Sequence, residues 1–276
     1  MIDKKKGIFA NLVTVFMWIY SIVIVGIIGY LIYNSLRSRS DILSNTMGKP
    51  QELSLANYIE LFVNDHFERY FLNSVIILIL SVILLIFLSS MVAYGLGRYK
   101  FRFNKGLRVF FLLGMMFPVQ LGIVPIFLFM QHLNLVDTFM SVILILGTAI
   151  SMPVFMLTEF FAKLPDELYE AAVIDGAGEW RIFFEIMFPL AKPVVFSVCI
   201  VTAVQIWNQF FIPLIFLQSE EKKTVPLLVV KYTHQLFNNM DLALAASVMS
   251  TVPILILFII FSKKILDGFA SGGVKG

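Results

Sequence analysis

The sequence predicts an all-α membrane protein with six transmembrane helices. Hydrophobic residues make up 59% of the 276 residues, charged residues make up only 14%, and the apolar residues fall in long uninterrupted runs. An average soluble domain has about 45–50% apolar and about 25% charged residues. A water-facing surface needs more charge than this chain carries, so the composition excludes disordered, fibrous and ordinary soluble globular proteins.

Six apolar runs are long enough to cross a bilayer, which takes about 20 residues of helix. None contains Asp, Glu, Lys or Arg: they are Leu12–Tyr33, Leu72–Leu96, Val109–Met130, Thr138–Thr158, Pro193–Leu217 and Leu242–Ser262. A helix satisfies its own backbone hydrogen bonds within lipid. The runs lack the two-residue alternation of membrane barrel strands, so helices are predicted.

The basic residues predict that both ends of the chain lie in the cytoplasm. With that orientation the inner segments hold 14 basic residues and the outer segments hold 7, as the positive-inside rule requires. The densest inner cluster is Arg98–Arg108, with five basic residues and no acid, which we interpret as a topology anchor. The first run is too long for a signal-peptide core and lacks an A-x-A cleavage site, so we expect an uncleaved helix.

The residues that carry chemistry are sparse. One Cys and three scattered His exclude a disulfide framework and give no metal site, and a net charge of +3 does not indicate nucleic acid. The chain has no phosphate-binding loop, nucleophile elbow or H-E-x-x-H pair. No apolar run holds an ionisable residue for ion coupling. If the protein moves a solute uphill, the energy must therefore come from another chain.

The inner loop at 163–189 predicts two helices on the cytoplasmic face. Pro165 suits a first helical position, acids follow in the first turn, and Gly176 and Gly178 end the first helix. The second helix is expected from about Glu179 to Met187, with an end at Pro189. Its large apolar residues are expected on one face: Trp180, Phe183, Phe184 and Met187.

The loop allows two interpretations. A short helix with small residues can dock into a groove of a partner and transmit a rigid-body movement, or it can be a surface helix that only orders the loop. On the outer side, the segment Asn34–Phe71 predicts one amphipathic helix along the membrane surface. Its apolar positions are Leu55, Ile59, Phe62 and Phe67.

The inner loop also carries a family motif. The sequence Glu170-Ala171-Ala172, then Asp175-Gly176-Ala177, then Ile186-Met187-Phe188-Pro189 resembles the EAA loop of permease subunits of binding-protein-dependent ABC importers. Phe188 stands where Leu is usual. Further segments are similar to maltose-type G permeases of the carbohydrate branch, including Ala93–Phe101, Met116–Gln120, Trp207–Phe211 and the terminal Gly272–Gly276. The similarity extends from about Leu53 to the end.

The resemblance implies a type I ABC importer transmembrane domain that forms a sugar path with a second permease subunit. Two cytoplasmic ATPase subunits would use ATP and Mg, an extracytoplasmic sugar-binding protein would deliver a di- or oligosaccharide, and this chain would bind no cofactor and catalyse no reaction. The chain would lie in a bacterial or archaeal inner membrane. Its expected divisions are 1–71 (tail, first helix and outer loop), 72–262 (permease domain) and 263–276 (cytoplasmic tail).

The resemblance also implies roles for the loop residues. Glu170 would be the polar contact with the ATPase, and small residues would permit close packing and the turn. The set expected to couple to the ATPase is Glu170, Ala171, Ala172, Asp175, Gly176 and Ala177. The Gly-rich tail is a further candidate for the ATPase interface.

Polar residues within the apolar runs are candidates for the solute path. Gln120 lies about 20 Å deep, where Pro118, Gly122 and Pro125 can open a helix; the alternative is a packing kink. Near the outer end of the fifth run, an aromatic ring and amides suit a sugar, whereas an interfacial aromatic belt is the alternative for the Trp. These residues are Gln205, Trp207, Asn208 and Gln209.

Two other classes stay open at this stage. A stand-alone secondary transporter or channel needs a self-contained path, for which six helices without buried charge are poorly suited. A membrane enzyme needs a nucleophile–base pair, and the sequence shows none.

Overall fold

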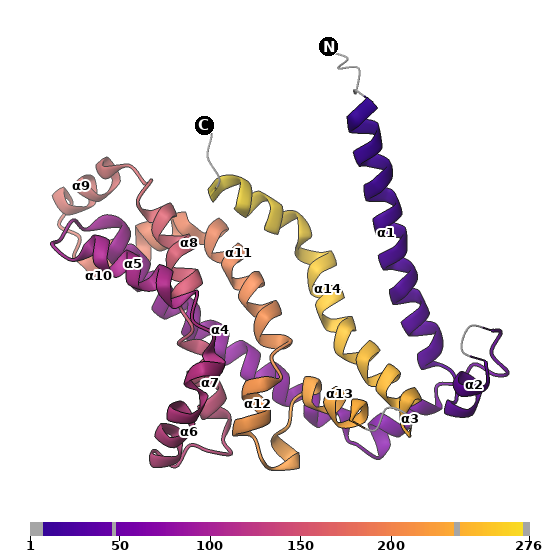
Figure 1. Ribbon diagram of the computed structural model, residues 1–276. Coiled ribbons are helices and arrows are strands. Elements are labelled where there is room, and N and C mark those ends of the chain that lie inside the picture. The colour runs from indigo at the N-terminus through magenta and orange to yellow at the C-terminus, as the bar shows by residue number, and fades with distance from the viewer. Residues whose placement is uncertain (1–7, 46–47, 235–237, 273–276) are drawn as a thin grey trace. The chain divides into compact units, whose positions relative to one another are not determined.

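A computed structural model of the chain describes residues 8–45, 48–234 and 238–272. Every regular element in this part is helical (Figure 1). The expected contributions of Lys4, Lys5 and Lys6 and of the last four tail residues lie outside the described residues. The helices are α1 Ile8–Ser35, α2 Arg39–Ser44, α3 Ala56–Val63, α4 Phe67–Arg98, α5 Asn104–Gly114, η1 Val119–Gly122, α6 Ile123–His132, α7 Phe139–Gly147, α8 Ser151–Phe161, α9 Asp166–Ile174, α10 Glu179–Arg181, η2 Ile182–Met187, α11 Phe188–Trp207, α12 Phe211–Phe216, η3 Glu220–Lys222, α13 Val225–Thr233 and α14 Met240–Gly272.

Four helices of the described residues are long and apolar enough to span a membrane, and the count reaches six when each of two bent helix pairs is one span. The four are Ala10–Ser35, Phe67–Arg98, Glu179–Trp207 and Met240–Ser262. The bent pairs are α5 with η1 and α6, at 92°, and α7 with α8, at 41°. The predicted all-α class with six spans is confirmed, and two of the spans are broken.

The break in the third span falls between Gly114 and Val119. Pro118 lacks a backbone N–H and disfavours helical backbone at Phe117, so the α-helix ends before this pair. The chain continues as the short 3₁₀ helix η1, which carries Gln120. The expected opening of the helix near Pro118 is thus present.

The predicted end of the second loop helix at Pro189 and the predicted end of the fifth span at Leu217 are both wrong. The helix does not end at Pro189: the π-helical segment η2 leads directly into α11, where Pro189 occupies the first turn and needs no hydrogen-bond donor. At the other end α11 stops at Trp207 and a new helix, α12, begins at Phe211. The side-chain oxygen of Gln209 accepts the N–H of Phe211 at 3.1 Å and so starts that helix.

The chain divides into two compact units. The first comprises the described residues up to Phe67 and Leu228–Val252. Its polar centre is Arg37, which is fully buried and donates to Asp41 at 2.8 Å and to Asn34 at 2.9 Å. The bond from Arg37 keeps the pKa of Asp41 below its ordinary value. Leu55, just before α3, and Ile59 and Phe62 on α3 are exposed as expected. Phe67, the first residue of α4, is buried, so its expected surface position is wrong.

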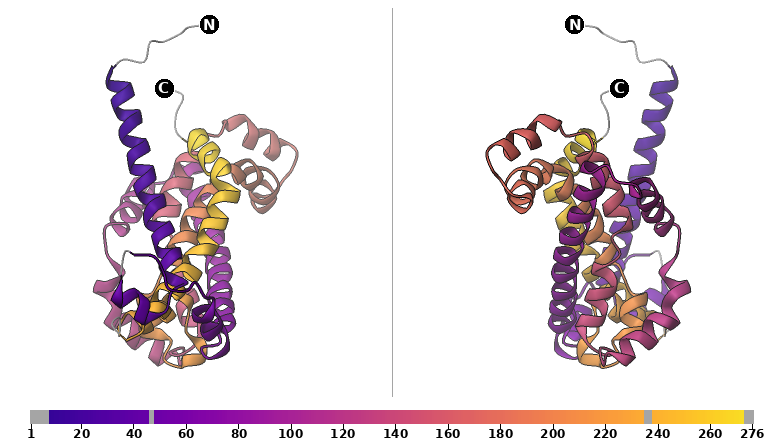
Figure 2. Two further views of the ribbon diagram at one scale, coloured as in Figure 1. Left: turned by 90° about the vertical axis from the view of Figure 1, so that its right-hand side faces the viewer. Right: turned by 90° about the vertical axis from the view of Figure 1, so that its left-hand side faces the viewer.

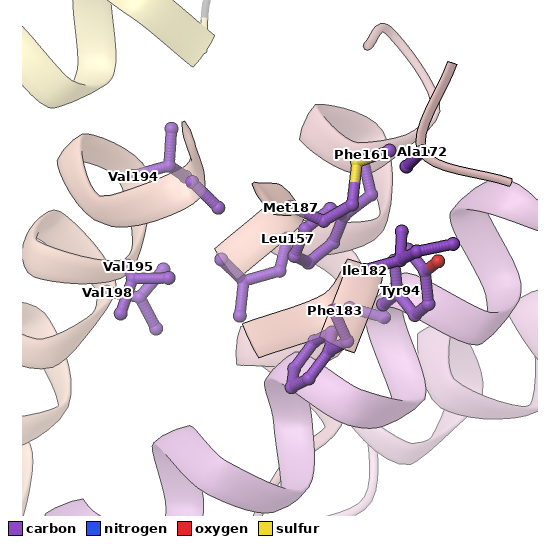
Figure 3. Packing of buried hydrophobic residues seen from close by; sticks show 12 residues of the cluster. Tyr94, Leu157, Phe161, Ala172, Ile182, Phe183, Met187, Val194, Val195 and Val198 are labelled. Carbon is purple, nitrogen blue, oxygen red and sulfur yellow. The ribbon is translucent and has the colours of Figure 1, made fainter. Parts of the chain in front are cut away.

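The second unit comprises Glu68–Leu227 with the described residues from Pro253 onward, and it contains two apolar clusters. Figure 3 shows the first cluster, where side chains of α4, α8, α9, η2 and α11 meet around Phe161, Ile182 and Met187. The second cluster joins α4, α6, α7, α11 and α12. Beside it, the carboxylate of Asp137 accepts from Ser219 and Gln218 and pairs with Lys222 at 3.0 Å, and the Ser219 bonds above all hold its pKa well below the ordinary value.

Helices α4 and α8 approach each other closely at Gly97. A Cβ atom at this position would lie 2.8 Å from Cβ of Phe161 and 3.0 Å from the backbone of Thr158 and Ala162. Small residues allow this backbone-to-backbone contact between membrane helices. Gly95, two residues earlier and on the opposite side of the same helix, has open space around its Cβ direction.

We predict that Gly97→Ala destabilises the chain by about 1–3 kcal/mol, because the methyl group forces two backbones apart. Gly95→Ala is the matched control: it adds the same methyl group to α4 without a clash and stabilises the helix by up to about 1 kcal/mol. Thermal unfolding of both variants in detergent tests this. Equal midpoints for the two variants would contradict the close approach.

Candidate coupling loop and solute path

The coupling loop, residues 163–189, carries α9 at the end of the second unit, and α9 with its following turn projects beyond the unit's other helices (Figure 2). The first turn of α9 contains Asp166 and Glu167, whose charges suit the positive end of the helix dipole. Pro165 precedes the helix with extended backbone, not within it. The predicted first helix of the loop is therefore present with nearly the expected ends.

The end of α9 is fixed by hydrogen bonds of the Schellman type. The N–H of Gly176 donates to the carbonyl of Val173, and the N–H of Ala177 donates to that of Ala172, both at 3.0 Å. Gly176 has φ of +74°, a left-handed conformation that costs other residues about 1–2 kcal/mol. Nothing lies within 4 Å of its Cβ direction, so the backbone angle, not space, requires glycine here.

The expected coupling residues divide between two faces of the loop. Ala172 is buried and packs in the chain's own first cluster (Figure 3). Ala177 is partly buried against the same cluster. Glu170, Ala171, Asp175 and Gly176 are exposed. Ala172 is small because α9 lies against its own chain, while the exposed residues are available to a partner.

Apolar side chains extend the exposed face of α9. Ile174 is 85% exposed and Val173 is 50% exposed, and both lie on the face of Glu170, four and three residues after it. Leu168, 40% exposed, lies on another side of the helix. An isolated helix of nine residues is only marginally stable in water. The stability of α9 therefore depends on its packing and on the contacts at its ends. An exposed apolar helix face flanked by a carboxylate is suited to docking in a groove.

Two charged contacts tie α9 to the end of α4. The guanidinium of Arg98 pairs with the carboxylate of Asp166 at 2.5 Å, donates to the Asp166 carbonyl at 3.1 Å, and lies 4.9 Å from the ring centre of Tyr169. Only 9% of the Arg98 side chain is exposed. The Asp166 side chain is 75% exposed, so only the arginine half of this pair is shielded from water.

A second contact joins three segments through one carboxylate. Glu179, at the start of α10, accepts the hydroxyl of Tyr99 on one oxygen and that of Tyr169 on the other. We call these three residues the tyrosine bracket; Figure 1 places its elements together at the end of α4. Burial raises the pKa of Tyr99, and the bond to Glu179 raises that of Tyr169, so both phenols stay protonated as donors at neutral pH.

The prediction of one apolar face on the second helix is wrong. Phe183 and Met187 are buried in the first cluster, whereas Trp180 and Phe184 are exposed and stack on each other at 6.1 Å. The π-helical turn of η2 changes the residue spacing, so positions that share a face in a regular α-helix separate.

The solute-path candidates differ in their accessibility. Gln120 on η1 and Gln205 on α11 are exposed, as is Asn208, whose amide donates to the carbonyl of Val204 at 2.9 Å. Trp207 is 6% exposed and packs edge-on against Phe71 at 5.8 Å. Gln209 is half-buried and starts α12 through its bond to Phe211. The amides of Gln120, Gln205 and Asn208 are thus the accessible polar groups of this set.

The sequence interpretation missed Arg98, Tyr99, Tyr169 and Glu179 as positioning residues. Arg98 appeared in the sequence only within a basic cluster and, with Tyr99, within the segment Ala93–Phe101 that is similar to maltose-type permeases; Glu179 appeared only as a helix start. Their meeting depends on how α4 packs against the loop, which local spacing does not contain. Within the described residues, no group of three or more His, Cys, Asp and Glu could hold a metal ion.

Comparisons with known proteins agree with this architecture. Residues 86–271 match the family of binding-protein-dependent transport system inner membrane components. The chain is 32% identical over 267 residues to the diacetylchitobiose uptake system permease protein NgcG of Streptomyces coelicolor, covering 96% of this chain and 88% of that protein. It is 39% identical over 255 residues to the arabinooligosaccharides transport system permease protein AraQ of Halalkalibacterium halodurans, covering 89% of each. The melibiose/raffinose/stachyose import permease protein MelC of Bacillus subtilis is 33% identical over 249 residues, covering 89% of this chain and 90% of that protein.

A solved structure shares the fold. It is the crystal structure of a bacterial ABC transporter involved in the import of the acidic polysaccharide alginate, and one of its chains aligns with a TM-score of 0.78 and 22% identity, over 95% of this chain and 98% of that chain. The type I importer fold predicted from the sequence is thereby confirmed. This chain belongs to the family of binding-protein-dependent transport system inner membrane components, the membrane permeases of ABC importers.

Proposed function

We propose that this chain is the permease subunit of a sugar importer, forms the translocation path with a second permease, and is driven by cytoplasmic ATPase subunits through its coupling loop. The observation that carries the proposal is the exposed, rigidly held α9, with Ile174 85% exposed on a membrane permease. The chain has no catalytic role in this proposal, and ATP and Mg act on the partner subunits.

The substrate class is proposed from the relatives. The names of the three relatives given above refer to diacetylchitobiose, to arabinooligosaccharides, and to melibiose, raffinose and stachyose. These are di- and oligosaccharides, and we propose the same class for this chain. An extracytoplasmic binding protein delivers the sugar.

The coupling step is proposed from the geometry of α9. Glu170 offers a charged contact, and Val173 and Ile174 offer apolar surface to a groove of one ATPase subunit. When ATP draws the two ATPase subunits together, α9 moves with the subunit that holds it. Because coupling between sites is reciprocal, a loaded binding protein in turn favours ATPase closure.

The movement then passes to α4 through the two contacts described above. On α9, Asp166 pairs with Arg98 at the end of α4. Tyr169, also on α9, shares the carboxylate of Glu179 with Tyr99, which directly follows α4. A rigid helix transmits displacement along its length, because packed elements shift between discrete arrangements. The tyrosine bracket is therefore the proposed link between the docking helix and the span.

The solute path and topology complete the proposal. The accessible amides of Gln120, Gln205 and Asn208 suit sugar hydroxyls. Both termini lie in the cytoplasm, and the chain lies in a bacterial or archaeal inner membrane. Its C-terminal tail is proposed as a second ATPase contact. The divisions 1–71, 72–262 and 263–276 stay predictions.

Reconstitution in liposomes tests the function as a whole. Uptake of an oligosaccharide taken up by the source cell is expected only when the second permease, the ATPase, the binding protein and ATP are all present. Uptake by this chain alone without ATP would instead favour a stand-alone transporter or channel.

We predict that Gly176→Ala lowers uptake by the complete importer. The left-handed φ of +74° costs alanine about 1–2 kcal/mol, which corresponds to roughly 5- to 30-fold in the population of the correct loop. Gly178→Ala is the matched control, because Gly178 has φ of −75° and open space around it. Radiolabelled sugar uptake into liposomes measures both. If the two variants transport equally, the turn at Gly176 does not position α9.

We predict that Glu179→Gln raises the amount of ATP hydrolysed per sugar imported by roughly 3- to 10-fold, because an amide oxygen accepts only one of the two tyrosine hydroxyls well. Glu185→Gln is the control: this exposed carboxylate pairs with Arg181 on the same helix. Parallel assays of ATPase activity and uptake give the ratio. If Glu179→Gln leaves the ratio of ATP hydrolysed to sugar imported unchanged, the tyrosine bracket does not take part in coupling.

A further inference from the structure

The turn that joins α4 to α5 presents an unneutralised positive surface. We call residues 99–105 the basic turn. Lys100, Arg102 and Lys105 are all exposed, and no acidic residue lies between Arg98 and Arg108 in the sequence. None of the three forms an ion pair with any residue that the structure describes.

The basic residues on either side of the basic turn, Arg98 and Arg108, contact other parts of the chain. Arg98 pairs with Asp166 and lies over Tyr169. Arg108 donates to Asn104 at 3.0 Å and to the carbonyl of Leu96 at 2.8 Å, and lies 3.8 Å from Glu159. Arg98 and Arg108 thus stabilise the fold through contacts with other segments, whereas Lys100, Arg102 and Lys105 form no ion pair with a described residue.

The basic turn has a defined shape. The side-chain amide of Asn104 donates to the carbonyls of Leu96 and Tyr99, both at 2.8 Å, and thus caps the end of α4. The N–H of Asn104 donates to the carbonyl of Phe101 at 3.0 Å. The three charges are therefore presented on an ordered backbone.

Aromatic side chains accompany the charges. Phe101 is 45% exposed and Phe103 is 69% exposed, and the guanidinium of Arg102 lies 5.9 Å from the ring centre of Phe103. The turn directly joins α4, an apolar span that ends at Arg98, to the apolar helix α5. A turn between two such helices lies at the surface of the bilayer. Basic residues there contact the headgroups, while aromatic rings enter the interfacial layer.

We propose that the basic turn is a binding site for the headgroups of anionic phospholipids, with Lys100, Arg102 and Lys105 contacting the phosphates and Phe101 and Phe103 inserted between the lipids. The charge is complementary, and the surface is continuous with the membrane-embedded helices on both sides. The proposal concerns the lipid around the permease and does not depend on the proposed coupling mechanism.

The experiment measures binding of dioctanoyl phosphatidylglycerol to the purified full chain in neutral detergent, by native mass spectrometry and by the shift in thermal midpoint. Dioctanoyl phosphatidylcholine and inorganic phosphate are the comparison ligands. The test variant carries Lys100→Gln, Arg102→Gln and Lys105→Gln. The matched control carries Lys49→Gln, Arg69→Gln and Lys192→Gln, which removes the same number and type of exposed charges elsewhere.

We expect the test variant to bind phosphatidylglycerol roughly 100-fold more weakly than the unaltered chain, since each basic residue near an anionic surface contributes about a factor of five. The matched control stays within about twofold. Binding by the unaltered chain weakens as salt rises, because exposed charges are screened. Phosphatidylcholine and inorganic phosphate bind weakly to every form.

Three results would overturn the proposal: unchanged phosphatidylglycerol binding in the test variant, an equal loss in the matched control, or equally tight binding of inorganic phosphate. If the triple variant does not fold, lipid binding is measured instead on a variant that keeps the charges, Lys100→Arg with Lys105→Arg. This variant should keep phosphatidylglycerol binding within about twofold, and a large loss there also counts against the site. If the triple variant still binds phosphatidylglycerol but no longer assembles with the ATPase, the basic turn contacts a protein partner instead of lipid.

Discussion

The position of α9 depends on one carboxylate that holds two tyrosine hydroxyls. Glu179 accepts from Tyr99 at the end of α4 and from Tyr169 on α9, so it fixes two segments to the start of a third. The neighbouring pair of Arg98 with Asp166 adds a second attachment. With its buried face on Ala172 and its far end closed by Gly176, the short helix stands as a rigid projection from the span.

The bilayer imposes the rest of the architecture. Within hydrocarbon every backbone group needs an internal partner, so the chain is helical wherever it crosses. Departures occur at Pro118, between α7 and α8, and after Trp207, and two of these three places carry candidate solute-path residues. Close helix contacts such as that at Gly97 rely on small residues, because apolar side chains gain little by leaving lipid for a neighbouring helix.

Much of the fold was predictable from the sequence, because long apolar runs and basic flanks follow directly from the membrane. The first helix of the coupling loop was predictable as well, from Pro165, the two acids and Gly176. The end of α11 and the division of Trp180 from Phe183 were not, since a π-turn and a new helix start depend on tertiary packing. The tyrosine bracket was invisible for the same reason: Tyr99 and Glu179 are 80 residues apart.

Accessibility of Ile174 in the assembled importer tests the central claim most directly. In a chain with Cys199→Ser and Ile174→Cys, the new thiol should react quickly with a maleimide when the permease is alone, because this side chain is 85% exposed. Assembly with the ATPase should slow that reaction at least 10-fold, while Lys49→Cys in the same background keeps its rate. An unchanged rate at position 174 in an importer that transports sugar would show that no partner covers α9, and the account would fail.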